Sequence, residues 1–245
     1  MKFDGKTAIV TGAANGLGKA TAMKLAEAGA KVAIVDISKE KLEEVSNSIR
    51  ANGGEVLAFA VDITKKDDVK KVVAEIIASF GHVDILINCA GSGWHKSCPF
   101  KDIPEENWEW ILDLNIKGTL YFTHAVLDNM TKRKYGKIIN VASIAAKTGI
   151  PNFAVYSASK GAIVSFTKAL AMELGPYNIN VNCISPGLIS ADGVASPTNG
   201  TFLGRKGTPQ EMAALIAFMV SDEASFITGV DYLIDGGRTL GPKGL

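Results

Sequence analysis

The chain has 245 residues, 47% of them hydrophobic, and is therefore long enough to bury the core of one large α/β domain. Its 26 basic and 25 acidic residues leave a formal net charge of +1, which gives no support for a nucleic-acid or membrane-surface partner. No apolar run approaches the roughly 20 residues of a membrane span, and neither the three cysteines nor the three histidines have metal-site spacing. We therefore expect a single cytoplasmic domain over residues 1–245, without a metal, that acts on a small molecule.

The chain opens with a β-rich run over residues 6–11, a glycine-rich turn and a predicted helix over residues 17–28. Gly12, Gly16 and Gly18 permit a tight turn and a close approach of the backbone, while free N–H groups at the helix start suit a pyrophosphate. The spacing is T-G-x-x-x-G-x-G rather than G-x-G-x-x-G. Taken alone, the motif is also compatible with a purely structural turn.

Asp36 ends the second predicted strand, residues 31–36. A carboxylate there can accept hydrogen bonds from both hydroxyls of an adenosine ribose, but it would repel a 2′-phosphate. Neither Ile37, which follows, nor Asn15 in the glycine turn supplies a positive charge that would offset this repulsion. These residues favour NAD over NADP. The alternative is that Asp36 only caps the next helix, although Ser38 is available for that task.

Helices and strands then alternate, with helices predicted over residues 38–52 and 67–80 and strands over residues 55–61 and 83–88. The third strand leads into Asp62 and Ile63, and the fourth into Asn88-Cys89-Ala90-Gly91. A loop with Trp94 and His95 follows, where Trp94 either lines a pocket or covers the core edge, and His95 either lines the pocket or lies in solvent. The next helix is predicted over residues 105–132, with Asn115 in its interior.

The stretch from Ser143 to Lys160 places a hydroxyl, a phenol and an ammonium where they can share one proton. Ser143 ends a predicted strand over residues 137–143, at the sheet edge where ligands bind. Tyr156 and Lys160 lie one turn apart on a helix predicted over residues 155–174. A cation within about 4–6 Å lowers the pKa of a tyrosine, so we expect Tyr156 to exchange a proton near neutrality. The same spacing also occurs by chance on solvated helix faces.

The remaining predicted elements are strands over residues 178–185 and 230–237 and a helix over residues 208–220. Pro186 and Gly187 follow the first of these strands. Residues 190–202 are rich in Ala, Gly, Ser, Thr and Pro and lack helical periodicity. We therefore expect a mobile, rather open substrate lid over about residues 188–207.

These motifs resemble the short-chain dehydrogenase/reductase family along nearly the whole chain. The resemblance rests on Thr11 to Gly18, Asn88 to Gly91, Asn115, Ser143, Tyr156, Lys160 and Pro186-Gly187, in the family's order and spacing. It implies a Rossmann-type α/β fold, a doubly wound parallel sheet of seven strands in the order 3-2-1-4-5-6-7 with helices on both faces. It also implies a homotetramer in which the two long helices, residues 105–132 and 155–174, pair across an interface.

The resemblance further implies an NAD-dependent oxidoreductase that interconverts a secondary alcohol and a ketone. Tyr156 would be the acid and base, Ser143 would hold the substrate oxygen, and Lys160 would lower the tyrosine pKa and bind the nicotinamide ribose. Asn115 would sit at a local helix irregularity and anchor a water. The implied cofactor residues are Gly12, Asn15, Gly16, Leu17, Gly18, Asp36, Ile37, Asp62, Ile63, Asn88, Ala90, Gly91, Tyr156, Lys160, Pro186, Gly187 and Ile189. The implied substrate pocket comprises Trp94, His95, Ser143, Ala145, Tyr156 and Leu188.

Two positions depart from the family pattern. Cys89 replaces the usual second asparagine, and Ala191 replaces a usual threonine, so that Ser190 or Asp192 would have to supply its hydrogen bond to the cofactor. Two alternatives stay open: an NADPH-dependent 3-oxoacyl-thioester reductase, which Asp36 opposes, and a non-catalytic dinucleotide-sensing module, which the intact catalytic residues oppose. The substrate is equally open between a cyclic or aryl-alkyl alcohol, a hydroxysteroid and a hydroxyacyl-CoA.

Overall fold

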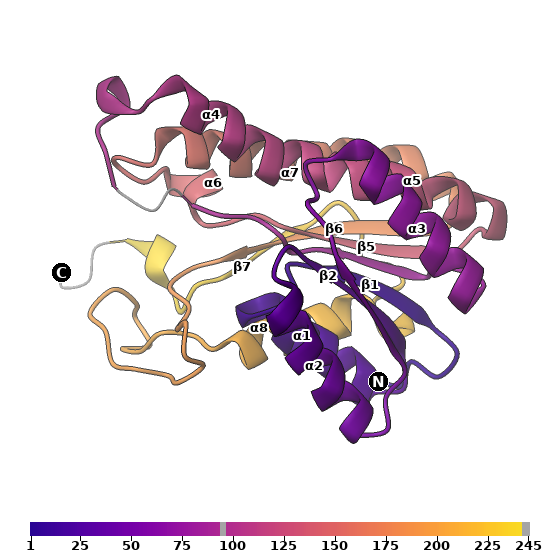
Figure 1. Cartoon of the computed structure of the whole chain (residues 1–245). Coiled ribbons are helices and arrows are strands. Elements are labelled where there is room, and N and C mark those ends of the chain that lie inside the picture. Colours follow the sequence, from indigo (N-terminus) through magenta and orange to yellow (C-terminus); the bar gives the residue numbers. More distant parts are fainter. Residues whose placement is uncertain (94–96, 242–245) are drawn as a thin grey trace.

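Seven parallel strands form the centre of the protein, as the computed structural model shows for the residues it describes, 1–93 and 97–241 (Figure 1). The strands are β1 (Thr7–Thr11), β2 (Lys31–Asp36), β3 (Val56–Ala60), β4 (Ile85–Asn88), β5 (Gly136–Val141), β6 (Ile179–Pro186) and β7 (Asp231–Ile234). Their order across the sheet is β3-β2-β1-β4-β5-β6-β7. The predicted doubly wound fold and strand order are confirmed.

Helices cover both faces of the sheet (Figure 1). On one face lie α1 (Gly16–Glu27), α2 (Lys39–Ala51) and α8 (Pro209–Met219); on the other lie α3 (Lys66–Phe80), α5 (Gly118–Arg133) and α7 (Ala154–Leu174). Successive residues of a strand point to opposite faces, so Ile9 packs in the core under α3 and α5, and Val10 in the core under α1 and α8. Because both of their faces are buried, β1, β2 and β4 are mostly apolar runs.

The predicted helix over residues 105–132 is divided into three parts. It consists of α4 (Glu105–Leu112), a π-helical turn (Asp113–Lys117) and α5. The Thr119 hydroxyl donates a 3.2 Å hydrogen bond to the backbone carbonyl of Asn115 inside this turn. The irregularity at Asn115 that the family resemblance implied is therefore present, although the apolar periodicity of the sequence ran through it without a break.

The last strand is shorter than predicted, because the chain turns after Ile234. The Asp235 carboxylate accepts 2.8 Å hydrogen bonds from the backbone N–H groups of Gly237 and Thr239. Gly236 and Gly237 have φ angles of 62° and 81°, in the left-handed region that favours glycine. The predicted strand over residues 230–237 is therefore wrong at Val230 and at residues 235–237, where the chain turns.

The predicted lid, residues 188–207, contains no helix. It is fastened by two isolated bridges, a parallel one between Ile189 and Gly207 and an antiparallel one between Pro197 and Arg205. Arg205 also pairs with Glu211 at 2.6 Å, and Glu211 forms a capping box with Thr208 at the start of α8. The base of the lid is thus joined to α8.

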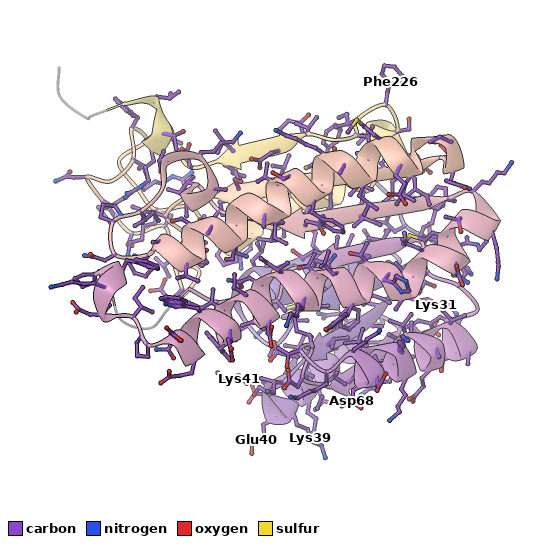
Figure 2. The ribbon with its side chains drawn as sticks, turned by 90° about the horizontal axis from the view of Figure 1, so that it is seen from above. Lys31, Lys39, Glu40, Lys41, Asp68 and Phe226 are labelled. Carbon is purple, nitrogen blue, oxygen red and sulfur yellow. The ribbon has the colours of Figure 1, made fainter. Side chains whose placement is uncertain are left out.

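Several exposed side chains project from opposite sides of the molecule. Figure 2 shows Lys39, Glu40 and Lys41 pointing away from the start of α2, and Phe226, in the loop before β7, pointing away from the opposite side. Phe226 is fully exposed. No helix in the described ranges combines the length and the apolar character needed to cross a membrane.

Candidate active site

A cleft of about 750 Å³ lies at the carboxyl ends of the central strands. The sequence-predicted residues that line it are Gly12, Asn15, Leu17, Gly18, Asp36, Ile37, Asp62, Ile63, Ala90, Gly91, Ser143, Tyr156, Lys160, Pro186 and Gly187. The predicted residues outside this lining are Gly16, Asn88, Asn115, Ala145, Leu188 and Ile189. Trp94 and His95, predicted for the substrate pocket, lie outside the described residues. The cleft therefore joins the predicted cofactor residues and the predicted catalytic residues in one space.

The glycine turn after β1 depends on close backbone contacts. A Cβ atom on Gly12 would lie 2.8 Å from the Cα of Ala90, and one on Gly18 would collide with the carbonyl oxygen of Gly12. The Thr11 hydroxyl accepts hydrogen bonds from the N–H groups of Cys89 (3.1 Å) and Ala90 (3.0 Å). These contacts hold the ends of β1 and β4 together, and only glycine fits where they meet.

The start of α1 suits a bound anion. Its first turn contains no acidic residue, and its N-cap residue Asn15 makes no side-chain capping bond. The first N–H groups of a helix have no partner within the helix, and the helix dipole makes this end positive. Together with the two glycine contacts, this end of the cleft fits the pyrophosphate of a dinucleotide.

Asp36 makes the hydrogen bond at the start of α2 that the sequence allowed, and it also faces the cleft. One carboxylate oxygen accepts the N–H of Ser38 at the start of α2, and the other accepts the N–H of Ala14 in the glycine turn, both at 3.1 Å. The Ser38 side chain makes no capping bond. Asp36 is partly exposed in the cleft, and each of its oxygens has a further lone pair for a ligand hydroxyl.

Asp62 and Ile63 form the far wall of the cleft. Asp62 Oδ1 accepts the backbone N–H (2.9 Å) and the hydroxyl (2.7 Å) of Thr64, so it stabilises a turn as well as lining the cleft. The Ile63 side chain packs against α5 at Gly118, where a Cβ atom would collide with it. This packing fixes the backbone of residue 63 beside the cleft.

Asn115 is clamped by the loop after β4 and by α7. Its Oδ1 accepts the N–H of Ser92, and its Nδ2 donates to the carbonyl of Ser92 and to the hydroxyl of Ser159, all at 3.0 Å. The Ser159 hydroxyl in turn donates to the backbone carbonyl of Tyr156 at 2.7 Å. This buried link from Asn115 to the backbone of Tyr156 was missed in the sequence, where the only signal is that Ser159 follows Tyr156 by three residues on one helix.

Asn88 lies behind the cleft rather than in it. Its Nδ2 donates to Asn140 Oδ1 on β5 (2.9 Å) and to the hydroxyl of Thr123 on α5 (3.1 Å), and Asn140 bonds onward to Thr167 on α7 at 2.9 Å. The Oδ1 atom of Asn88 is buried without a partner among the described residues. Through this network Asn88 braces the central sheet against α5 and α7, and the contributions of Asn140 and Thr167 were not predicted.

Ser143, Tyr156 and Lys160 meet at the middle of the cleft. The Ser143 hydroxyl is hydrogen-bonded to the phenol of Tyr156 and accepts the N–H of Ala145 at 3.2 Å. Lys160 is buried, its ammonium donates to the Val141 carbonyl at 2.9 Å, and it lies 5.8 Å from the centre of the Tyr156 ring. A hydroxyl, a phenol and an ammonium therefore converge on the same wall.

The predicted effect of Lys160 on the tyrosine is wrong in this structure. Burial raises the pKa of Tyr156 above its ordinary value, and the hydrogen bond from Ser143 only partly opposes this. Burial also lowers the pKa of Lys160 to about 8. The ammonium bonds to Val141 instead of to the phenol, so its distance from the ring leaves desolvation as the dominant influence on Tyr156.

The residues predicted for the substrate side have mixed positions. Ala145 is buried, and it contributes through its N–H to Ser143 rather than through its side chain. Gly207 donates its N–H to the Leu188 carbonyl and accepts the N–H of Ser190. The N–H and carbonyl of Ile189 therefore point away from Gly207. The Ser190 hydroxyl donates to Asp192, so both suggested substitutes for the usual threonine bond to each other.

Comparisons with known proteins agree with this geometry. The family model for short chain dehydrogenases matches residues 6–200. An NAD-dependent glycerol dehydrogenase of Listeria innocua is 43% identical over 244 residues, which cover 96% of this chain and 94% of the relative. A 3-oxoacyl-(acyl-carrier-protein) reductase of Thermotoga maritima is 36% identical over 248 residues, covering 98% of this chain and 100% of the relative.

Solved structures give the same result. An NAD⁺-bound xylitol dehydrogenase superposes with a TM-score of 0.90 at 35% identity, covering 97% of this chain and 100% of its own. The chain belongs to the short-chain dehydrogenase family, and it is an oxidoreductase. Within the part of the chain that the structure describes, no group of three or more His, Cys, Asp or Glu residues is arranged to hold a metal.

Proposed function

We propose that this protein interconverts a secondary alcohol and a ketone by hydride transfer with NAD. The observation that carries the proposal is that Ser143, Tyr156 and Lys160 line the same cleft as Asp36 and the glycine turn. Two similar proteins are named an NAD-dependent glycerol dehydrogenase and a xylitol dehydrogenase. Both names denote the oxidation of an alcohol, which supports this reaction class.

Tyr156 serves as the acid and base. In alcohol oxidation its phenolate takes the proton of the substrate hydroxyl, and Ser143, already hydrogen-bonded to the phenol, holds the substrate oxygen. The nicotinamide ring supplies the hydride acceptor at its C4 atom when it is bound. Proton transfer by a positioned group contributes roughly 10²–10⁴-fold to rate, and orientation of the reactants adds to it.

Lys160 supplies the positive charge next to this centre. One of its three N–H donors is used by Val141, which leaves the others for the nicotinamide ribose and for a phenolate on Tyr156. Asn115 positions the centre through Ser159 and is proposed to anchor a water that connects to the lysine. A Cβ atom on Gly91 would lie 2.8 Å from Asn115 Oδ1 and 3.0 Å from Lys160 Nζ, so both groups flank the same residue.

NAD is the proposed cofactor because Asp36 ends β2 at the cleft. Its carboxylate, next to the exposed and uncharged Ile37, would repel a 2′-phosphate. This repulsion argues against the second candidate function, an NADPH-dependent 3-oxoacyl-thioester reductase. The similarity to the Thermotoga maritima reductase is the observation that favours that second candidate. The convergence of Ser143, Tyr156 and Lys160 opposes a non-catalytic dinucleotide sensor.

We place the working enzyme in the cytoplasm as a homotetramer. Its three cysteines are free thiols, which suits a reducing compartment. The outer side of α7 carries small residues, among them the exposed Ala158, Ser165 and Ala169, and it ends near Met172, which is 76% exposed. A helix face of this kind can pack closely against its copy across a two-fold axis.

The direct test is a screen of secondary alcohols in which NAD reduction is followed by absorbance. The expected result is turnover of at least one alcohol with NAD, and its loss in the variant Tyr156→Phe. If acetoacetyl thioesters were reduced with NADPH far faster than any alcohol or ketone is converted with NAD or NADH, the thioester reductase would replace this proposal.

A further inference from the structure

A second cavity of about 300 Å³ lies beside the cleft, on the β7 side of the sheet. Its walls come from the segment after β5 with Ile144 and Thr148, from lid residues 199–202, and from the turn after β7 with Arg238 and Thr239. All three segments follow carboxyl ends of neighbouring parallel strands. The cavity therefore lies at the same sheet edge as the proposed active site.

The two cavities share a wall. Ser143 and Pro186 line the cleft, and Ile144, the residue after Ser143, lines the second cavity. The N–H of Ile144 donates to the carbonyl of Pro186 at 3.1 Å, which fixes this wall between β5 and β6. The two cavities are therefore neighbours, with the buried Ile144 between them.

The second cavity has a cation with spare hydrogen-bond donors. A guanidinium has five N–H donors, and Arg238 uses one of its nitrogens in a 3.1 Å bond to the carbonyl of Gly200. No carboxylate of residues 1–93 or 97–241 forms an ion pair with Arg238, whereas Arg205 in the same lid is paired with Glu211. The nearby Asp235 carboxylate accepts backbone N–H groups of the turn instead.

Polar groups surround this guanidinium. Asn199, Thr148 and Thr239 line the cavity together with Arg238, and Asn199 is exposed on the lid. Ile144 and Phe202 add apolar surface to the same lining, so the cavity pairs a charged and polar end with a hydrocarbon wall. Guanidinium groups bind carboxylate and phosphate oxygens in pairs, with charge-assisted hydrogen bonds that are about twice as strong as neutral ones.

We propose that the second cavity receives the distal end of the substrate and that Arg238 binds an anionic group there. The substrate is then a small hydroxylated acid or phosphate ester that carries its secondary alcohol near Ser143. This inference rests on the proposed function for the position of the alcohol, and it adds a specificity residue and a substrate class.

Matched alcohols with and without an anion test the specificity. The carboxylate arm compares 2-butanol with 3-hydroxybutanoate and its homologues 4-hydroxypentanoate and 5-hydroxyhexanoate, which probe the distance to Arg238; the phosphate arm compares glycerol with glycerol 3-phosphate. The wild-type protein is expected to prefer an anionic member in kcat/KM by about 10- to 100-fold. Arg238→Gln should abolish this preference through KM, with kcat and the neutral alcohols nearly unchanged.

A control separates binding of the anion from loosening of the lid. Arg205→Gln breaks the ion pair to Glu211 in the same lid, at a site away from the second cavity. It should leave the preference for anionic alcohols intact. An equal loss of preference in Arg205→Gln and Arg238→Gln would overturn the role of Arg238, since both changes would then act through the lid.

A binding measurement keeps this inference separate from the proposed reaction. Glutarate and inorganic phosphate, titrated calorimetrically with and without NADH, should bind the wild-type protein through at least one of the two anions and lose binding in Arg238→Gln. Binding of this kind without turnover of any alcohol would reject the proposed reaction and keep the anion site. Turnover of neutral alcohols without binding of either anion would reject the anion site alone.

Discussion

The ammonium of Lys160 donates a 2.9 Å hydrogen bond to the carbonyl oxygen of Val141, the last residue of β5. This bond holds a buried cation at the end of the central sheet, and burial lowers its pKa to about 8. In the unfolded chain the lysine has an ordinary pKa near ~10.4. Folding therefore carries an electrostatic cost at this position whenever the lysine is charged.

The cost at Lys160 predicts a dependence of stability on pH. Between about pH 8 and pH 10.4 the unfolded chain binds more protons than the folded protein, so the contribution of this lysine to stability rises with pH, by on the order of 3 kcal/mol in total. Below pH 8 the cost is present in full. Urea unfolding of the wild type and of Lys160→Met should be measured at several pH values. The free energy of unfolding of the wild type should increase relative to that of the variant across this range. A stability difference that is constant with pH would contradict the lowered pKa.

Tyr156→Phe removes the proposed proton acceptor and leaves the glycine turn and Asp36 intact. We expect kcat/KM to fall by ~10²–10⁴-fold, while the Kd for NADH stays close to that of the wild type. Because burial raises the pKa of Tyr156, wild-type oxidation, which needs the phenolate, should speed up with rising pH, and ketone reduction should slow down. Tyr177→Phe, at an exposed tyrosine outside the cleft, is the matched control. Substantial turnover by Tyr156→Phe would show that the proton goes elsewhere.

Asp36→Ala tests the choice of cofactor. Removing the carboxylate removes the repulsion of a 2′-phosphate and the hydrogen bonds to the ribose, so the ratio of kcat/KM for NAD over NADP should fall by about tenfold or more. Asp62→Ala, in the same cleft, is the control and should weaken both cofactors alike. Equal use of NAD and NADP by the wild type would refute the argument from Asp36.

The strands were predictable because their physical signals are local, whereas their order across the sheet and the proposed roles of Ser143, Tyr156 and Lys160 came from the family resemblance. Strands buried on both faces are short apolar runs, and the spacing of Tyr156 and Lys160 follows from one helical turn. The pKa of Tyr156 was not predictable, since it depends on how deeply the fold buries the phenol and on where the Lys160 ammonium points. The π-helical turn at Asn115 was also invisible to apolar periodicity, because it changes the phase of the helix by a single residue.

The role of Ser159 could not be predicted from the sequence either, since it depends on Asn115, which is far away in the sequence. Its buried hydroxyl joins the Asn115 side chain to the Tyr156 carbonyl. Ser159→Ala leaves a buried N–H of Asn115 unpaired, so we expect a loss of about 1–3 kcal/mol in unfolding free energy and a fall in kcat that exceeds the change in KM. Ser48→Ala, which removes a hydroxyl bond on the surface of α2, should change neither. An unchanged kcat in a destabilised Ser159→Ala would make the serine purely structural.

The small residues on the outside of α7 indicate that copies of the protein associate through this helix. Ser165 and Ala169 are exposed one turn apart, and a Cβ atom on Gly161, one turn before Ser165, would meet no atom within 4 Å. Helix faces with side chains this short let two backbones approach closely, so self-association through α7 would bury them.

Light scattering should therefore give a mass of about four times 25.8 kDa at micromolar concentration. Ser165→Arg places a long charged side chain where two copies of α7 are proposed to meet, so it should reduce the mass to that of a dimer or monomer. Asn47→Arg, an exposed position on α2 at the other face of the sheet, should leave the mass unchanged. A wild-type mass near 25.8 kDa would refute the tetramer, and an unchanged mass in Ser165→Arg would move the interface away from α7.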